Sequence, residues 1–301
     1  MKQHFVALVL AGSSISAMSE PLFPNSIASN HLDFILPNDP GACWSISEQE
    51  GGRTEMYDPR SDTFFVDNAR HFEVTFPNQV IRINVHPDVG NHEQRAREAA
   101  ASVSRLPVLM RIQLRYVNIL NGDGTAWSVD AGRFFTLYDG LMARQLAEHD
   151  LDETVFHETA HVALDPILSQ DPDWRSNQEA DGAFITHYAA QNPNTEDIAE
   201  SALFAWTLIY RPGRLPKDVE TEVRSVIPNR LEYLGNMMEG FEPPSCYISR
   251  SLNQNENNTI SPDGYAVRIV DGGIICSIRR LGSGALQEAE GQTFSVVSCA
   301  T

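Results

Sequence analysis

Two histidines and a glutamate lie close together with the residue types and the spacing of a hydrolytic metal site. They form the stretch His-Glu-Thr-Ala-His at residues 157–161, inside a run over residues 152–165 whose pattern predicts a helix. Side chains four residues apart lie one above the other on a helix, so His157 and His161 can reach one ion. Glu158 projects beside them and can accept a proton from a water molecule that the metal activates. This spacing predicts a zinc site with an adjacent general base.

The third ligand of such a site must come from another part of the fold, because catalytic zinc usually takes three protein ligands and one water. A second predicted helix carries Glu196 and Glu200 on one face, again four residues apart. Glu196 could bind the metal, and Glu200 could accept the free ring N–H of a ligand histidine, which fixes its tautomer. Three alternatives stay open: His187 as the third ligand, a solvated acidic face on the second helix, and an amphipathic first helix with unliganded histidines.

The two stretches together resemble the gluzincin branch of the zincin metallopeptidases, in which His-Glu-x-x-His is followed a few tens of residues later by Glu-x-x-x-(Glu/Asp). The pattern is most similar to lethal-factor-type catalytic domains and their secreted relatives, where a Tyr-Gly or Tyr-Ala element precedes a Glu-x-x-Ala-Glu helix. In this chain Tyr188-Ala precedes Glu196-Asp-Ile-Ala-Glu200. The resemblance implies that Glu196 binds zinc, that Glu200 supports a ligand, and that Tyr188 stabilises the oxyanion; otherwise Tyr188 is a core aromatic residue.

Two departures from the family pattern bear on the ligand set. The residue before the second histidine is Ala160, where the family often has glycine. The metzincin extension, with glycine three and histidine six residues after the second histidine, is absent because Leu164 and Ile167 stand there. Asp165 is expected just past the end of the helix, where it either supports a ligand histidine or simply begins the loop.

Segments upstream of the metal-binding helix alternate apolar and polar residues, as strands do. Such runs cover residues 72–85, 109–120, 125–129 and 133–138, and a helix-like run covers residues 92–105. By the resemblance, Ala126, Trp127 and Ser128 would form the edge strand over the cleft, where an extended peptide can add as another strand. An ordinary hairpin is the alternative.

Downstream, helical patterns predominate as far as about Met238. We expect a loop over residues 166–173 and a helix over residues 175–190 that carries Tyr188 near its end. The Glu196 helix is expected to run to Tyr210, and Pro216 is placed to open another helix. The fold class expected from these patterns and from the resemblance is α+β, with a zincin-like metallopeptidase core of a twisted N-terminal sheet, an active-site helix and a helical C-terminal subdomain.

The composition restricts the partners. The chain has 301 residues and a net charge of −18, without a basic stripe that could neutralise phosphates. This charge argues against a nucleic acid or an anionic membrane surface as partner. The partner that the motif predicts is a peptide or protein substrate.

The N-terminus predicts secretion. Residues 1–19 have a basic start, a short apolar run and small residues at the end, which is typical of a secretory signal peptide. In a secreted chain the even number of cysteines predicts two disulfides among Cys43, Cys246, Cys276 and Cys299, with three possible pairings. The alternative for Cys43 is a thiolate that blocks the zinc in a latent form.

The expected organisation has four parts. A signal peptide over residues 1–19 precedes an irregular segment over residues 20–60, which wraps the domain or is a short pro-segment. The zincin-like catalytic domain covers residues 61–243. Residues 244–301 are expected to form a small, disulfide-containing β appendage, with strands over residues 264–270, 273–279 and 293–298.

These patterns lead to two hypotheses of different classes. The first is a secreted zinc metallopeptidase with His157, His161 and Glu196 as ligands and Glu158 as general base. The second is a secreted binding or adhesion protein whose zincin-like core is structural or degenerate. Glu158 favours the first, because a protein that only binds has no need of a general base beside the metal.

Overall fold

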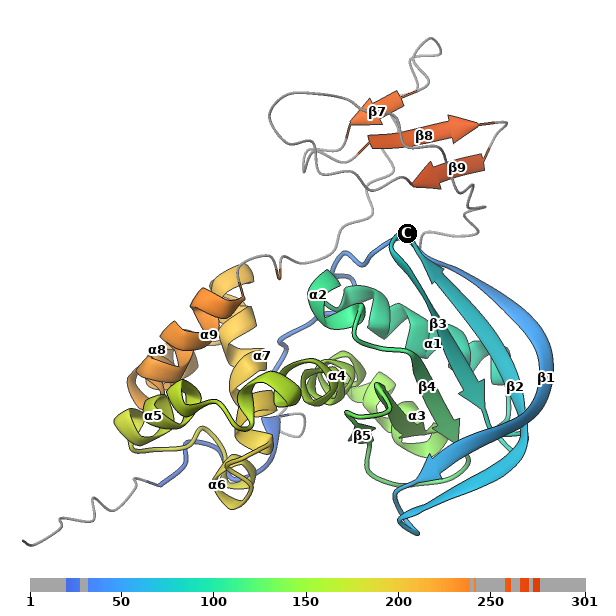
Figure 1. Ribbon diagram of the computed structural model, residues 1–301. Helices are drawn as coiled ribbons and strands as arrows, with labels where there is room; N and C mark the ends of the chain where they lie inside the picture. The colour runs from blue at the N-terminus through green and yellow to red at the C-terminus, as the bar shows by residue number, and fades with distance from the viewer. Residues whose placement is uncertain are drawn as a thin grey trace, which may run out of the picture.

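The fold is mixed, with a sheet in the first half of the chain and helices in the second (Figure 1). The computed structural model describes residues 20–27, 32–238, 241, 258–260, 266–270 and 273–276, the last three ranges by their backbone alone. Within these residues a six-stranded sheet and nine helices confirm the expected α+β class. The predicted signal peptide, residues 1–19, lies outside the described residues.

The main sheet has the strand order β1-β2-β3-β4-β6-β5. Strands β1, β2 and β3 are antiparallel, β3, β4 and β6 are parallel, and β5 pairs antiparallel with β6 at the edge. Their bounds are β1 Ser45–Asp58, β2 Thr63–Phe76, β3 Gln79–Val85, β4 Tyr116–Leu120, β5 Trp127–Val129 and β6 Phe134–Tyr138. The expectation of an irregular segment over residues 20–60 is therefore wrong for β1.

The strand pattern has a clear physical origin in β2, where Phe72, Val74 and Phe76 alternate into the core.

The run over residues 109–120 was expected to be one strand, which is wrong for its first part. A short helix, α2 Val108–Arg111, precedes β4 there. Met110 and Arg111 are neighbours in the chain and are both buried. In a strand with one solvent-exposed face, neighbouring side chains would point to opposite faces, so this burial fits a helical turn better.

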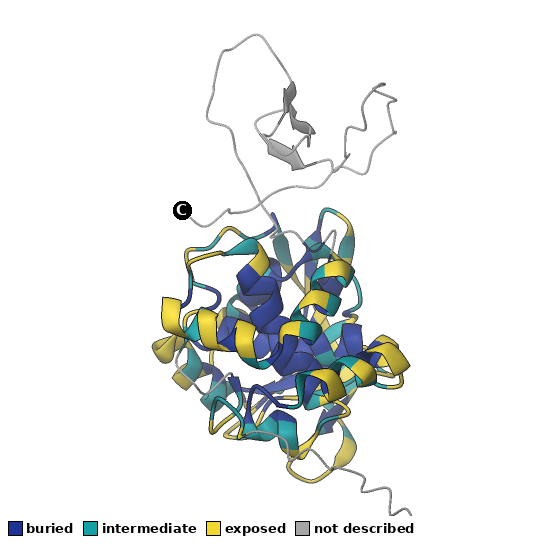
Figure 2. Ribbon diagram, turned by 90° about the vertical axis from the view of Figure 1, so that its left-hand side faces the viewer, coloured by how far each residue is buried: buried dark blue, intermediate teal, exposed yellow. Residues whose placement is uncertain are grey.

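The remaining helices surround one central helix. Their bounds are α1 His92–Arg105, α3 Asp139–Glu148, α4 Leu151–Leu168, α5 Pro172–Asp181, α6 His187–Gln191, α7 Glu196–Tyr210, α8 Lys217–Val226 and α9 Pro228–Met237. Helix α4 contacts α1, α7, β5 and β6, and lies between the sheet and the helical half of the molecule (Figure 1). Buried residues accordingly gather in the interior, while the outer helices carry the exposed ones (Figure 2).

Two helix boundaries differ from expectation. Helix α4 continues to Leu168 with Pro166 inside it, so Asp165 lies within the helix and not past its end. The backbone carbonyl of Asp165 still accepts the N–H of Ser169, at 2.9 Å, so the last turn of α4 stays helical despite Pro166. The single helix expected over residues 175–190 is two helices, because Gly182 ends α5 with a left-handed φ of 64°. Thr186 then caps α6 by accepting the N–H of Ala189 at 3.0 Å.

The segment before β1 is irregular but packed into the core. Ile27, Phe34 and Ile35 are buried there. The backbone N–H groups of Phe34 and Ile35 donate to the Glu153 carboxylate of α4, at 3.1 and 2.9 Å. The chain ahead of the sheet is therefore tied to the central helix.

The C-terminal strands are β7 Asn258–Ile260, β8 Ala266–Val270 and β9 Gly273–Cys276, which form an antiparallel three-stranded sheet. Two of the strands expected there are thus present in shortened form, and the one over residues 293–298 lies outside the described residues. Among the described helices, none is both long enough and apolar enough to cross a membrane.

The buried Glu153 leads to a first prediction. Burial raises the pKa of its carboxyl group to about 8, helped by the nearby charges of Asp152 and Asp150. Between its ordinary pKa of 4.5 and 8 the unfolded chain has released this proton while the folded chain keeps it. The free energy of unfolding should therefore fall as the pH rises through this window, by up to about 1.4 kcal/mol per pH unit from this group.

We expect Glu153→Gln, which cannot titrate, to flatten this fall between about pH 5 and 8. Urea unfolding of the wild type and the variant at several pH values measures the two slopes. Glu148→Gln, at an exposed position of α3, serves as the control. Parallel profiles for the wild type and Glu153→Gln would contradict the buried-acid explanation.

Candidate metal centre

The central helix presents the two histidines of the His-Glu-x-x-His stretch toward α7. His157 and His161 lie one turn apart on α4, and their ring centroids are 4.8 Å apart. His157 and Glu158 are each only 6% exposed. Almost every residue of α4 is buried, polar ones included, because the helix is enclosed by the sheet and α7. Polar groups buried in this way need partners close at hand.

A carboxylate of α7 completes a triangle with the two imidazoles. Glu196 Oε2 lies 3.2 Å from His157 Nε2 and 3.2 Å from His161 Nε2, and the two nitrogens are 3.1 Å apart. Ligand atoms at 2.0–2.1 Å from a tetrahedral zinc ion would be about 3.3 Å apart. The three atoms are therefore spaced as three zinc ligands are. In the part of the chain that the structure describes, His157, His161 and Glu196 are the one group of three or more such side chains close enough together to hold a metal ion.

Outer carboxylates face the other nitrogens of both rings. His161 Nδ1 lies 2.8 Å from Asp165 Oδ2, and His157 Nδ1 lies 3.5 Å from Glu200 Oε1. An imidazole that donates its Nδ1 proton to a carboxylate keeps a lone pair on Nε2. His161 has such a hydrogen bond to Asp165. His157 Nδ1 is buried, has no hydrogen-bond partner among the described residues and lies at ion-pair distance from Glu200. With a proton on Nδ1, each ring keeps a lone pair on Nε2, so two nitrogens and the Glu196 carboxylate converge. A cation among them would satisfy all three, and the residues present thus fit a zinc ion.

The electrostatics of the site follow from burial and opposing charge. Burial alone would lower the pKa of both histidines. Hydrogen bonds to Glu196 and, for His161, to Asp165, together with the negative charge of nearby carboxylates, outweigh this effect. The pKa of each ring is therefore raised, that of His161 most strongly. Burial likewise opposes ionisation of Glu196, yet the two histidines hold its pKa well below the ordinary value. The site therefore favours a positive charge between α4 and α7.

The candidate general base lies beside the edge strand. The Ser128 hydroxyl of β5 donates to Glu158 Oε2 at 2.5 Å. Of the residues expected in this strand, Trp127 and Ser128 lie in β5, whereas Ala126 precedes it and is buried. Trp127 is 49% exposed, and among the described residues β5 pairs with one strand only, namely β6.

Tyr188 lies near the candidate ligands, on the short helix α6. Burial, the charge of Glu196 and a hydrogen bond to Glu196 raise the pKa of the Tyr188 hydroxyl well above its usual value. Glu158 and Glu200 add to this effect. The hydroxyl thus keeps its proton at neutral pH and can donate it in a hydrogen bond.

Other candidates are not brought to the centre. His187, the rival third ligand, points to Glu20, with 2.9 Å between its Nε2 and the carboxylate, and its side chain is 42% exposed. Cys43, the alternative blocking thiolate, is buried and does not belong to the cluster. Cys246 and Cys299 lie outside the described residues, as does the side chain of Cys276, so the disulfides stay a prediction.

Two residues at the site, Ser26 and Ile27, were not predicted, and Ser128 was predicted on the edge strand but not as a partner of Glu158. Ser26 and the backbone of Ile27 bind Glu200, and Ser128 binds Glu158. The motif contains no signal for them, because Ser26 is 174 residues away from Glu200 along the chain.

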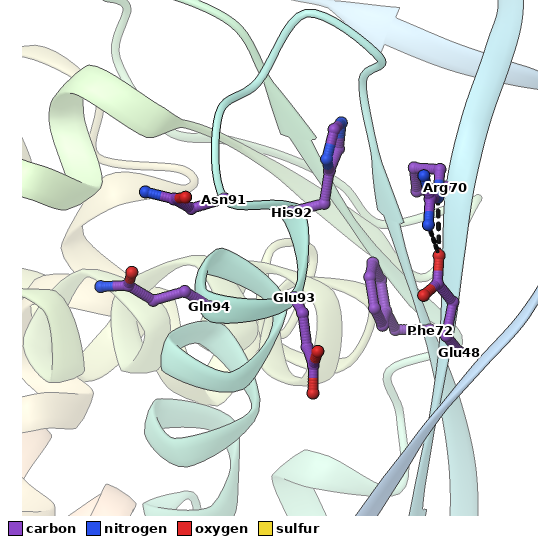
Figure 3. A pocket seen from close by; sticks show the side chains of 7 residues that line it. All are labelled: Glu48, Arg70, Phe72, Asn91, His92, Glu93 and Gln94. Atoms are coloured by element: carbon purple, nitrogen blue, oxygen red, sulfur yellow. Dashed lines mark hydrogen bonds and ion pairs between the residues drawn. The ribbon is translucent and has the colours of Figure 1, made fainter.

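A surface hollow lies elsewhere, between the β1–β2 pair and the start of α1 (Figure 3). Its lining includes Glu48, which is paired with Arg70, and His92 and Glu93. None of its lining residues belongs to the triangle of ligand atoms. The chemistry predicted from the motif therefore does not extend to this hollow.

Comparisons with known proteins yield no relative. No model of a protein family matches the chain, and neither a curated protein nor a solved structure matches it. The function must therefore be argued from the site itself.

The geometry leads to a prediction about the third ligand. Glu196→Ala removes one corner of the triangle and should weaken zinc binding by more than about 100-fold, because two protein ligands hold zinc far less well than three. His187→Ala should leave zinc binding unchanged, since that ring faces Glu20. Competition titration against a chromophoric chelator measures both variants. Zinc lost in His187→Ala and kept in Glu196→Ala would overturn the assignment.

Proposed function

We propose that this chain is a secreted zinc metallopeptidase of the gluzincin type, with a zincin-like core. The observation that carries the proposal is the triangle of His157 Nε2, His161 Nε2 and Glu196 Oε2, with edges of 3.1, 3.2 and 3.2 Å. Beside it stands Glu158, a carboxylate that does not belong to the triangle. A metal site with three protein ligands and an adjacent base is the arrangement that metal-assisted hydrolysis of a peptide bond uses.

Zinc held by these residues would act as a Lewis acid that polarises a carbonyl and lowers the pKa of water. In this mechanism Glu158 accepts the proton of the attacking water and passes it to the leaving amine. Ser128 holds the Glu158 carboxylate on the side of the edge strand. Asp165 holds the His161 ring in orientation through a hydrogen bond, and Glu200 places a negative charge 3.5 Å from His157 Nδ1.

Tyr188 is the proposed oxyanion donor. Its hydroxyl keeps its proton and lies close to Glu196, so it can turn toward negative charge that develops on the substrate oxygen. A positioned donor of this kind is typically worth about 3 kcal/mol in the transition state.

The edge strand supplies the proposed substrate surface. Strand β5 has one sheet neighbour, and its Ser128 reaches the candidate base. An extended peptide that pairs with β5 as an additional strand would therefore run past Glu158. This arrangement favours a peptide or protein substrate.

The carboxylate of Glu158 allows the most direct test of turnover. Glu158→Gln keeps the size of the side chain but cannot accept a proton, so cleavage should fall by at least about 100-fold. Zinc content should not change, because Glu158 is not among the three ligand residues. Cleavage of a quenched-fluorescent peptide library measures turnover, with the exposed Glu148→Gln as a matched control.

Activity retained in Glu158→Gln would contradict the mechanism. A wild-type chain that binds zinc and cleaves nothing would instead favour the other class, a secreted binding protein with a zincin-like core.

Tyr188→Phe tests the oxyanion role separately. Loss of the hydroxyl should lower kcat by about 100-fold while KM and zinc affinity change little, because the donated hydrogen bond forms in the transition state. Steady-state kinetics on a peptide found in the library measure both constants. An unchanged kcat would remove Tyr188 from the mechanism.

A further inference from the structure

The segment that precedes the sheet reaches the metal centre through Glu200. The Ser26 hydroxyl donates to Glu200 Oε1 at 2.5 Å, and the Ile27 N–H donates to Oε2 at 2.7 Å. A hydrogen bond with the Thr186 side chain adds to these two. Glu200 itself is 0% exposed, so its hydrogen bonds come from within the fold. Two of these three contacts come from residues 26–27.

These contacts determine where the Glu200 carboxylate lies. A buried carboxylate without partners is costly, and each donor that binds one of its oxygens also fixes its rotation. The oxygen that accepts from Ser26, Oε1, is the one that faces His157 Nδ1 at 3.5 Å. The hydroxyl of Ser26 thus fixes the position of the carboxylate oxygen whose charge acts on the His157 ring.

The same segment is anchored on both sides of the site. Phe23 pairs through its backbone with the residues that lead into α6: its N–H donates to Ile185 O at 3.0 Å, and the His187 N–H donates to its carbonyl at 3.0 Å. Its ring stacks on Phe204 of α7, with 5.6 Å between the centroids. Residues 20–27 therefore join the helix that carries Tyr188 to the helix that carries Glu196.

We infer that residues 20–27 are a positioning element of the metal centre, not a removable inhibitory segment, and that Ser26 acts on His157 through Glu200. This inference rests on the proposed function. An inhibitory segment would have to occupy the ligand side of the cluster, whereas Ser26 and Ile27 bind the outer carboxylate behind His157. Proteolytic removal of this segment should therefore weaken the site, not activate it.

The test measures zinc affinity of the full chain by competition with a chromophoric chelator at fixed pH. Loss of an outer partner of a ligand histidine typically costs about 10–100-fold in metal affinity, which we expect for Glu200→Gln. Ser26→Ala should lose about 10-fold, because Glu200 remains but is less well held. Ser26→Thr keeps the hydroxyl and should bind as the wild type does. Ser225→Ala, an exposed serine of α8, is the matched control.

A double variant distinguishes action through Glu200 from a general loss of structure. If Ser26 acts through Glu200, Ser26→Ala should cost little more affinity in the Glu200→Gln background than Glu200→Gln alone. Equal losses in both backgrounds, or wild-type affinity in Ser26→Ala, would overturn the inference while leaving the zinc site intact. A wild-type chain that binds no zinc would instead contradict the proposed function itself.

Discussion

The packing of α4 against α7 is the contact on which the site depends. It places two carboxylates of α7, the partly buried Glu196 and the buried Glu200, opposite the two imidazoles of α4. The start of α7 is held by another buried charge pair, in which Arg230 of α9 binds both Asp197 and Asp181. Breaking such a pair by removing one partner typically costs about 3–5 kcal/mol. The position of Glu196, next to Asp197, therefore depends on α9 as well as on α7.

The sheet contributes a different constraint. It fixes one side of α4 through β6 and presents the short edge strand β5 beside Glu158. The long pair β1 and β2 extends the sheet on the opposite edge, far from β5 in the strand order. The proposed chemistry thus sits at the end of the sheet where β5 is the edge strand of the described residues and a carboxylate is held by Ser128. The proposed ligands come from the helices and the proposed substrate surface comes from the sheet.

The sequence predicted what depends on local spacing. The helix around residues 157–161 and the helix from Glu196 follow from a period of 3.6 residues. The meeting of Glu196 with the two histidines does not follow from that period, and it was expected from the resemblance to the zincin metallopeptidases. It did not predict β1, because that strand lies mostly exposed at the edge and carries no apolar alternation. Gly51 also breaks its regularity, since a Cβ there would lie 2.8 Å from Ala69 O. The contact of Ser26 with Glu200 could not be predicted from the sequence, because the two residues are 174 positions apart and only the complete fold brings them together.

The central claim is that zinc lies among two imidazole nitrogens and one carboxylate oxygen, and X-ray absorption at the zinc edge tests it most directly. The purified chain, loaded with one equivalent of zinc, should show a first shell of nitrogen and oxygen at about 2.0–2.1 Å with an imidazole signature. Glu196→Ala should lose an oxygen from this shell, and His161→Ala should lose an imidazole. A sulfur shell at about 2.3 Å would assign the metal to cysteine and contradict the claim. A spectrum of hydrated zinc, unchanged by either substitution, would contradict it equally.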